Sequence, residues 1–205
     1  MPKRGRPQLP ESPTRRLILK AAAWLFRSKG YKKVTIEDIC IKAGASKMTF
    51  YRHFKDKGHI AFTILELFFE AEILWADQVL QSDIPFLEKM NQFLSRKEKN
   101  QEKLGIIFLT EFNQVSDPRS KVFEDKWTKK ITQTNVKFLE QGQALEFISE
   151  KMKPDVFLFF IKKRNDLIMD KDLMAICPDF KTRFEVVNDF FYFGLRKRVN
   201  HGHPQ

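Results

Sequence analysis

Apolar residues recur at helical spacing along most of this 205-residue chain, and this periodicity restricts its fold more than any other feature. The first run lies between Pro13 and Gly30, two residues suited to begin and end a helix. Its apolar members are Leu17, Ile18, Ala21, Ala22, Leu25 and Phe26, which share one helical face. Strand signals are few, because alternating runs are short and no Asn-Gly or Asp-Gly pair is present to form a tight hairpin turn. We therefore expect an all-α protein.

Helix-breaking residues divide the chain into about nine predicted helices. The main breaks fall at Gly44, at residues 83–85, at Asp117-Pro118, at Gly142 and at Cys177-Pro178. The predicted helices span residues 13–29, 36–43, 47–53, 57–80, 85–98, 101–115, 119–141, 154–169 and 180–197. We expect a small domain with a basic N-terminal arm over residues 1–57, and a larger helical domain over residues 58–205.

Charge is distributed unevenly between these two parts. The formal net charge is +11. Residues 1–57 contain 15 Lys and Arg residues against 4 Asp and Glu residues, whereas the remainder contains 22 of each, so the whole excess lies in the N-terminal part. This concentration predicts a polyanionic partner such as nucleic acid. The alternative is a basic face that meets only solvent and salt.

The basic part also carries the pattern of a helix-turn-helix. Thr35 is placed to cap one short helix, Gly44 can adopt the left-handed conformation that ends it, and Ser46 can cap the next. In this motif the second helix enters the DNA major groove, with its N-terminal residues at the base edges. Phe50 and Phe54, four residues apart, are expected to fix that helix to the rest of its domain.

Residues at the start of the second helix have the chemistry for base contacts. Lys47 can donate to guanine O6 and N7, Thr49 can hydrogen-bond or touch a thymine methyl, and Met48 can make only apolar contact. Lys57 opens the following helix, where its ammonium and the free backbone amides can meet a phosphate. The residues predicted to contact DNA are Arg4, Arg6, Thr35, Ser46, Lys47, Met48, Thr49, Tyr51, His53 and Lys57. The alternative for the aromatic and basic members is ordinary packing or solvation.

The order and spacing of these residues resemble the signature of the TetR family of transcriptional regulators. The resemblance rests on Thr35-Ile36-Glu37-Asp38-Ile39, Ala43-Gly44-Ala45-Ser46, Thr49-Phe50-Tyr51-Arg52-His53-Phe54 and Lys57. It is strong over residues 14–65, and weaker and architectural over residues 140–147 and 190–195. The resemblance implies a homodimeric DNA-binding regulator, usually a repressor, whose C-terminal domain binds a small molecule that alters the separation of two recognition helices.

Aromatic residues supply candidates for the dimer interface and the effector site. The last two predicted helices carry more apolar surface than one buried stripe needs, and the candidate interface residues are Phe157, Phe160, Phe184, Val187 and Phe191. The candidate lining of an apolar or aromatic effector pocket is Phe62, Phe69, Trp75, Phe108, Phe112, Trp127 and Phe138. The alternatives are helices fully buried within a monomer and aromatic residues that form only the core.

The N-terminal arm has a short sequence of its own. Pro2-Lys3-Arg4-Gly5-Arg6-Pro7 resembles the core of an AT-hook peptide, in which glycine lets the backbone approach the groove floor and both guanidinium groups reach a narrow A·T-rich minor groove. The alternative is a solvated basic tail that attracts DNA without sequence preference.

Two other classes of function fit the sequence less well. A helical enzyme with a basic patch would need a catalytic constellation, but the chain has four histidines and no HExxH, GxSxG or P-loop motif. An architectural or RNA-binding protein is the third reading, which selective binding to a duplex operator would exclude. We expect no enzymatic activity, cofactor or metal. Two distant cysteines and the absence of a signal sequence or a membrane-length apolar run favour the cytoplasm.

Overall fold

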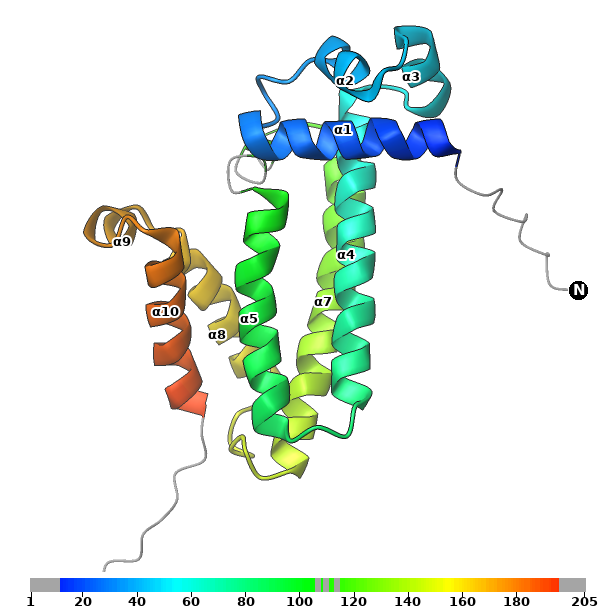
Figure 1. The fold of residues 1–205 in the computed structure, drawn as a ribbon. Helices are drawn as coiled ribbons and strands as arrows, with labels where there is room; N and C mark the ends of the chain where they lie inside the picture. The colour runs from blue at the N-terminus through cyan, green and yellow to red at the C-terminus, as the bar shows by residue number, and fades with distance from the viewer. Residues whose placement is uncertain (1–11, 106–107, 109–110, 113–114, 196–205) are drawn as a thin grey trace, which may run out of the picture. The chain divides into compact units, whose positions relative to one another are not determined.

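A computed structural model describes residues 12–105, 108, 111–112 and 115–195 of the chain (Figure 1). Its helices are α1 (Pro13–Lys29), α2 (Ile36–Ala43), α3 (Lys47–His53), α4 (Lys57–Gln81), α5 (Phe86–Leu104), α7 (Arg119–Ala144), α8 (Pro154–Ile168), α9 (Lys171–Ile176) and α10 (Phe180–Leu195). These nine helices within the described residues confirm the predicted all-α class. The predicted DNA-contacting residues Arg4 and Arg6 lie outside the described residues.

The first three helices begin and end where the sequence predicts, because their caps are local. The Ser12 side chain accepts a hydrogen bond from the Arg15 amide at the start of α1. Thr35 and Asp38 form a reciprocal capping box at the start of α2. Local hydrogen bonds of this kind can be predicted from sequence spacing alone.

Two predicted boundaries were wrong, and one helix was not predicted. No helix boundary lies near residue 100, because α5 continues to Leu104 and ends at Gly105, whose φ is +80°. Gly142 does not end α7 but lies buried within it. The helix α9 was not predicted, since it has only 6 residues; Asp170 starts it by accepting hydrogen bonds from two backbone amides.

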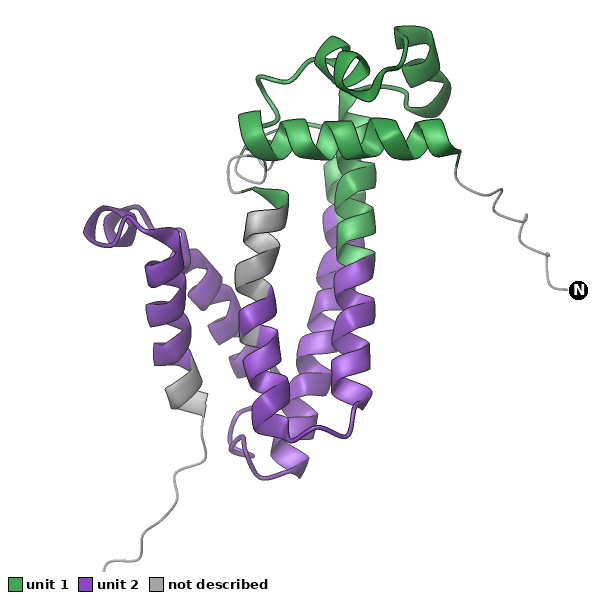
Figure 2. Ribbon diagram, viewed as in Figure 1, with its two compact units in different colours: residues 1–70, 100–123 green, residues 71–99, 124–205 purple. Residues whose placement is uncertain are grey.

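The packing divides the chain into two compact units (Figure 2). Unit 1 contains residues 1–70 and 100–123, and unit 2 contains residues 71–99 and 124–205. The helices α4, α5 and α7 therefore each contribute residues to both units. The predicted domain boundary at residue 57 follows the helix-turn-helix motif, whereas this division follows packing and adds residues 58–70 and 100–123 to unit 1.

The core of unit 1 joins the N-terminal helices to residues from the later segment of the same unit, residues 100–123. Phe26 of α1 stacks on Phe108 with ring centroids 5.2 Å apart, and Phe62 of α4 meets Phe112 edge-on at 4.9 Å. Ile18, Ile39 and other apolar residues of α1 and α2 complete the same cluster. Since Phe108 and Phe112 are almost completely buried, the helix-turn-helix does not form its core from residues 1–57 alone.

Unit 2 contains two smaller clusters. The first consists of Phe86, Met90, Leu139, Ile148 and Phe157. The second consists of Ile168, Phe184 and Val187, where α8 packs against α10. Arg183 stabilises the connection between these helices, because its guanidinium donates to the carbonyls of Ile168 at 2.7 Å and Cys177 at 2.6 Å.

The position of Gly142 gives a stability prediction for unit 2. A Cβ at this residue would lie 2.6 Å from both Ile148 Cδ1 and Phe86 Cζ. Gly142→Ala should therefore lower the free energy of unfolding by about 1 kcal/mol, because overpacking costs about 2 kcal/mol and helix propensity returns about 1 kcal/mol. Urea denaturation measures the change, with Glu140→Ala at an exposed position of α7 as the control. Equal or greater stability of Gly142→Ala would contradict the close packing.

Candidate nucleic-acid interface

The turn between α2 and α3 is fixed by backbone geometry and one side-chain cap. Gly44 lies in the left-handed region with φ 62° and ψ 35°, and its amide donates to the carbonyls of Cys40 and Ile41. Ser46 then begins α3 by accepting a hydrogen bond from the Thr49 amide at 3.1 Å. An L-residue at position 44 would strain this backbone, so glycine sets the angle at which α3 follows α2.

Helix α3 has a buried face and an exposed face. Phe50 and Phe54 are almost completely buried, as the sequence predicts, and their ring centroids lie 5.6 Å apart. Lys47 is exposed, and the exposed fractions of Met48 and Tyr51 are 73% and 55%. The aromatic anchors therefore leave the basic and polar side of α3 open to solvent, while His53 is half-buried at its end.

Lys47 is paired with an acidic residue that sequence reasoning did not single out. Its ammonium donates to Glu37 Oε2 on α2 at 2.9 Å, and both side chains are largely exposed. The hydrogen bond to Glu37 is the main reason that the pKa of Lys47 is raised. Glu37 therefore limits where the Lys47 ammonium can reach, and its carboxylate lies beside the predicted base-contacting group.

The hydroxyl groups predicted to meet DNA take part in helix capping. Thr35 Oγ1 accepts from the Asp38 amide and donates to the Asp38 carboxylate. The pKa of Asp38 is lowered mainly by the hydrogen bond from the Thr35 backbone amide and further by the one from the Thr35 hydroxyl. Ser46 Oγ and Thr49 Oγ1 lie 2.9 Å apart and share a hydrogen bond. Any contact of these three hydroxyls with DNA would have to be compatible with, or replace, these local bonds.

The Lys57 side chain stabilises the loop between α1 and α2. Its ammonium donates to the carbonyls of Tyr31 at 3.0 Å and Val34 at 2.9 Å, and lies 4.3 Å from the centroid of the Tyr31 ring. Burial lowers the pKa of Lys57. Of the ammonium's three N–H groups, two are thus engaged within the protein, and the predicted phosphate contact would use the third.

A second charged cluster anchors the start of α4. The Arg119 guanidinium contacts Asp56 Oδ1 at 3.0 Å and donates to Asp117 Oδ1 at 2.8 Å, and it lies over the Phe62 ring. Gly58 leaves room for it, because a Cβ there would lie 2.5 Å from Arg119 Nη2. Sequence reasoning missed this cluster, since no local pattern joins Asp56 to an arginine 63 residues later.

The residues predicted to line an effector pocket do not form a single set within either unit. Phe62, Phe69, Phe108 and Phe112 belong to unit 1, where they join or border its core. Trp75, Trp127 and Phe138 belong to unit 2. There, Trp75 packs against Phe93 at 5.1 Å, and Phe138 against Phe86 at 5.0 Å.

The residues predicted to form a dimer interface also differ in accessibility. Phe157, Phe184 and Val187 are buried within the single chain, whereas Phe160 is partly exposed and Phe191 half-buried. Among the side chains that the structure describes on α8 and α10, the most exposed apolar ones are instead Val156, Phe159, Val186 and Phe190. Helical periodicity identified the apolar helices but not which of their faces the protomer already covers.

Comparisons with known proteins agree with this architecture. Residues 18–64 match the sequence model of the bacterial regulatory proteins of the tetR family. The HTH-type transcriptional repressor KstR2 of Mycolicibacterium smegmatis is 26% identical over 161 residues, which are 76% of this chain and 78% of that protein.

Solved structures show the same fold at low sequence identity. The regulatory protein TetR from Rhodobacter sphaeroides aligns with a TM-score of 0.70 and 16% identity, over 90% of this chain and all of that chain. The fatty acid degradation regulator FadR from Bacillus halodurans aligns with a TM-score of 0.70 and 17% identity, over 93% of this chain and all of that chain. SmeT in its complex with triclosan aligns with a TM-score of 0.64 and 17% identity, over 95% of this chain and 98% of that chain.

The capped α2 and α3 pair with its exposed basic face forms a helix-turn-helix, and the family match over residues 18–64 makes the class that of a helix-turn-helix transcriptional regulator. Within that class, the segment of residues 18–64 is similar to the bacterial regulatory proteins of the tetR family. No helix among its described residues is long and apolar enough to span a membrane.

The Arg119 cluster gives a pH-dependent stability prediction. The pKa of Asp117 is lowered by its hydrogen bonds with Arg119; for Asp56, burial acts to raise the pKa, but bonds from Arg119 and the His59 amide outweigh it. Carboxyls with lowered pKa stabilise the fold above their unfolded values, about 4, and this stability is lost as pH falls through the folded values.

Arg119→Met should therefore lower the free energy of unfolding near pH 7 by about 1 kcal/mol, a value reduced for solvent screening of this partly exposed group. The difference from the unsubstituted protein should shrink below about pH 4. Urea denaturation midpoints measured near pH 7 and below about pH 4 test this, with Arg52→Met at an exposed position of α3 as the control. A difference that is the same at both pH values would contradict the charge pairing.

Proposed function

We propose that the protein represses transcription by binding a roughly palindromic duplex operator as a homodimer, and that a small molecule in its C-terminal part releases it from DNA. The observation that carries the proposal is the exposed basic and polar face of α3, fixed in orientation by the buried Phe50 and Phe54. The homodimer would act in the cytoplasm. Repression is also supported by the similarity to the repressor KstR2.

DNA recognition would begin at the N-terminal end of α3. Lys47, Met48 and Thr49 occupy that end, and the side chain of Tyr51 is exposed one turn later. Lysine is suited to guanine O6 and N7 in the major groove, and the tyrosine hydroxyl to a phosphate oxygen. The positive charge of residues 1–57 adds a sequence-independent attraction.

Dimerisation would use the exposed apolar sides of α8 and α10. Phe159, Phe160, Val186 and Phe190 all leave large apolar side chains at the surface of one protomer. A two-fold symmetric pair of such faces removes them from water. The same symmetry would place two α3 helices on one DNA duplex, and half-sites about 34–36 Å apart would match adjacent major grooves.

An apolar or aromatic effector fits the aromatic content of the helices beyond the motif. Triclosan, the compound named in the complex of the similar protein SmeT, is an aromatic example. Helix α4 begins four residues after α3 ends and supplies residues to both units, so a change in its conformation offers a route from an effector to the DNA-contacting helix. Such an effector would have to bind more tightly to the form that does not fit DNA.

Selection of binding sites from random duplex DNA would test operator recognition directly. We expect a symmetric consensus with two equivalent half-sites. Enrichment of single half-sites without symmetry would contradict the dimeric reading, and enrichment of no sequence would favour an architectural or RNA-binding role.

Substitution of Lys47 tests its role in reading bases. Lys47→Ala should relax the preference at one base position in each half-site by about 1–3 kcal/mol, because it removes a donor to the base edge. Tyr51→Phe removes only a hydroxyl and should weaken binding to all sequences alike. Mobility-shift titrations on the consensus and on single-base variants give both values.

A further variant separates base reading from charge. Glu37→Gln keeps Lys47 but removes its ion-pair partner, so base preference should be retained while overall affinity rises. A uniform loss of affinity with Lys47→Ala, at every base pair tested, would assign Lys47 to the DNA backbone instead.

Phe190 tests the proposed dimer interface. Its exposed fraction is 76%, so Phe190→Glu should leave the protomer folded and move the population from dimer to monomer, measured by sedimentation velocity. Ile41→Glu on α2 is the control, because Ile41 is 74% exposed and lies on the helix-turn-helix. A persistent dimer with Phe190→Glu would place the interface elsewhere.

A further inference from the structure

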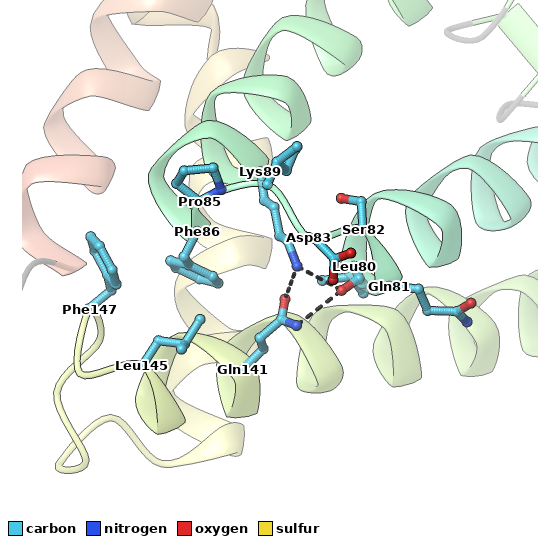
Figure 3. Close-up of a pocket in the computed structure, with 11 residues that line it drawn as sticks. Leu80, Gln81, Ser82, Asp83, Pro85, Phe86, Lys89, Gln141, Leu145 and Phe147 are labelled. Atoms are coloured by element: carbon cyan, nitrogen blue, oxygen red, sulfur yellow. Dashed lines mark hydrogen bonds between the residues drawn. The ribbon is translucent and has the colours of Figure 1, made fainter.

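A pocket in unit 2 contains a buried positive charge (Figure 3). The pocket has a volume of about 740 Å³, within the range of sites for small molecules. The last turn of α4, the first turns of α5 and the end of α7 surround it. Its apolar lining residues are Leu80, Ile84, Pro85, Phe86, Leu145 and Phe147. None of the aromatic residues that the sequence suggested for an effector site lines this pocket.

Lys89 supplies the charge. Its side chain runs from α5 toward the end of α4 and toward Gln141 of α7 (Figure 3), and it is only 4% exposed. The ammonium donates to the Leu80 carbonyl at 2.9 Å and to Gln141 Oε1 at 3.3 Å. The Gln141 side-chain amide nitrogen donates to the same Leu80 carbonyl at 3.0 Å. This carbonyl therefore accepts hydrogen bonds from both Lys89 and Gln141.

The partners of this ammonium are neutral. Both acceptors are uncharged oxygens, and within the described residues no carboxylate forms an ion pair with Lys89. Asp83 also lines the pocket, but its side chain is exposed. A buried charge is costly unless an opposite charge compensates it, and two of the three ammonium N–H groups are engaged here. One donor therefore remains for a ligand, on a positive charge that no carboxylate pairs.

We propose that this pocket binds a small carboxylate with an apolar body. The carboxylate would accept a hydrogen bond from Lys89, and the hydrocarbon part would lie against Phe86, Leu145 and Phe147. A neutral apolar compound would leave the charge uncompensated, and a free inorganic anion would leave the apolar lining exposed. The proposal concerns unit 2 only and needs neither DNA binding nor dimerisation, so its test is independent of the proposed function.

Helix capping is the competing explanation for Lys89. Leu80 lies in the last turn of α4, where carbonyls lack helical partners and a cation is favourable. Capping accounts for the hydrogen bond from the ammonium to the Leu80 carbonyl but gives the pocket no preference for anions. The two explanations therefore differ in which ligands bind.

Calorimetric titration of the full-length protein near pH 7 with octanoate, 1-octanol and inorganic phosphate separates them. Octanoate and 1-octanol share the same chain length and differ in charge. Octanoate should bind about tenfold more tightly than 1-octanol, because a charge-assisted hydrogen bond is about twice as strong as a neutral one. Phosphate should bind more weakly than octanoate. Equal affinities for octanoate and 1-octanol, or phosphate binding as tight as octanoate, would overturn the proposal.

Substitutions at Leu145 test the site without removing the Lys89 cap. Leu145 lines the pocket and is 51% exposed, so either charge is compatible with folding. Leu145→Lys should bind octanoate about tenfold more tightly than Leu145→Glu, whereas the two variants should bind 1-octanol equally. Octanoate affinity that does not depend on the sign of this charge would overturn the proposal.

Removal of the lysine charge completes the set. Lys89→Met should abolish the preference for octanoate over 1-octanol. Thermal unfolding of this variant checks that it still folds without the lysine at the end of α4. Lys151→Met removes one exposed charge from the same unit and should retain the preference. If Lys89→Met does not fold, the Leu145 pair still decides the result. A preference that persists in folded Lys89→Met would assign the anion to another site.

Discussion

Burial of Phe50 and Phe54 is the interaction on which the candidate DNA interface depends. Helix α3 has only 7 residues, and a helix of this length is unstable by itself in water. The two rings fix both its position and its rotation, so that Lys47, Met48 and Tyr51 remain on the exposed side. The caps at Thr35 and Ser46 and the left-handed Gly44 set where the helices begin and end, but side-chain burial decides which face the solvent meets.

Much of this arrangement could be predicted because its causes are local in sequence. Capping residues, the turn glycine and the spacing of Phe50 and Phe54 all act within a few positions of the backbone they control. The same reasoning failed at Gly142, where a buried glycine permits close packing with Phe86 and Ile148 rather than ending a helix. It also did not separate the buried Phe157 and Phe184 from the exposed Phe159 and Phe190, since that distinction depends on contacts between helices.

Two lysines show why charge patterns alone did not identify the polar interactions of the fold. Lys57 and Lys89 both direct their ammonium groups to backbone carbonyls, Lys57 between α1 and α2 and Lys89 at the end of α4. Main-chain oxygens accept from both lysines, and any residue could supply such an acceptor; Lys89 also donates to Gln141 Oε1, but that residue is 52 positions away, so local sequence does not indicate either contact. The Arg119 cluster, in contrast, uses acidic side chains, but their separation along the chain conceals it.

The discontinuous core of unit 1 affects how the protein folds during synthesis. Phe26 stacks on Phe108 and Phe62 packs on Phe112, so the rings that complete the environment of α1 and the start of α4 come from a later part of the chain. A ribosome that has released only the first 57 residues has produced the whole helix-turn-helix sequence without these rings. Domains generally fold as units as they emerge. The helix-turn-helix is therefore among the first segments made, but its hydrophobic core becomes complete only after more than half of the polypeptide has left the exit tunnel.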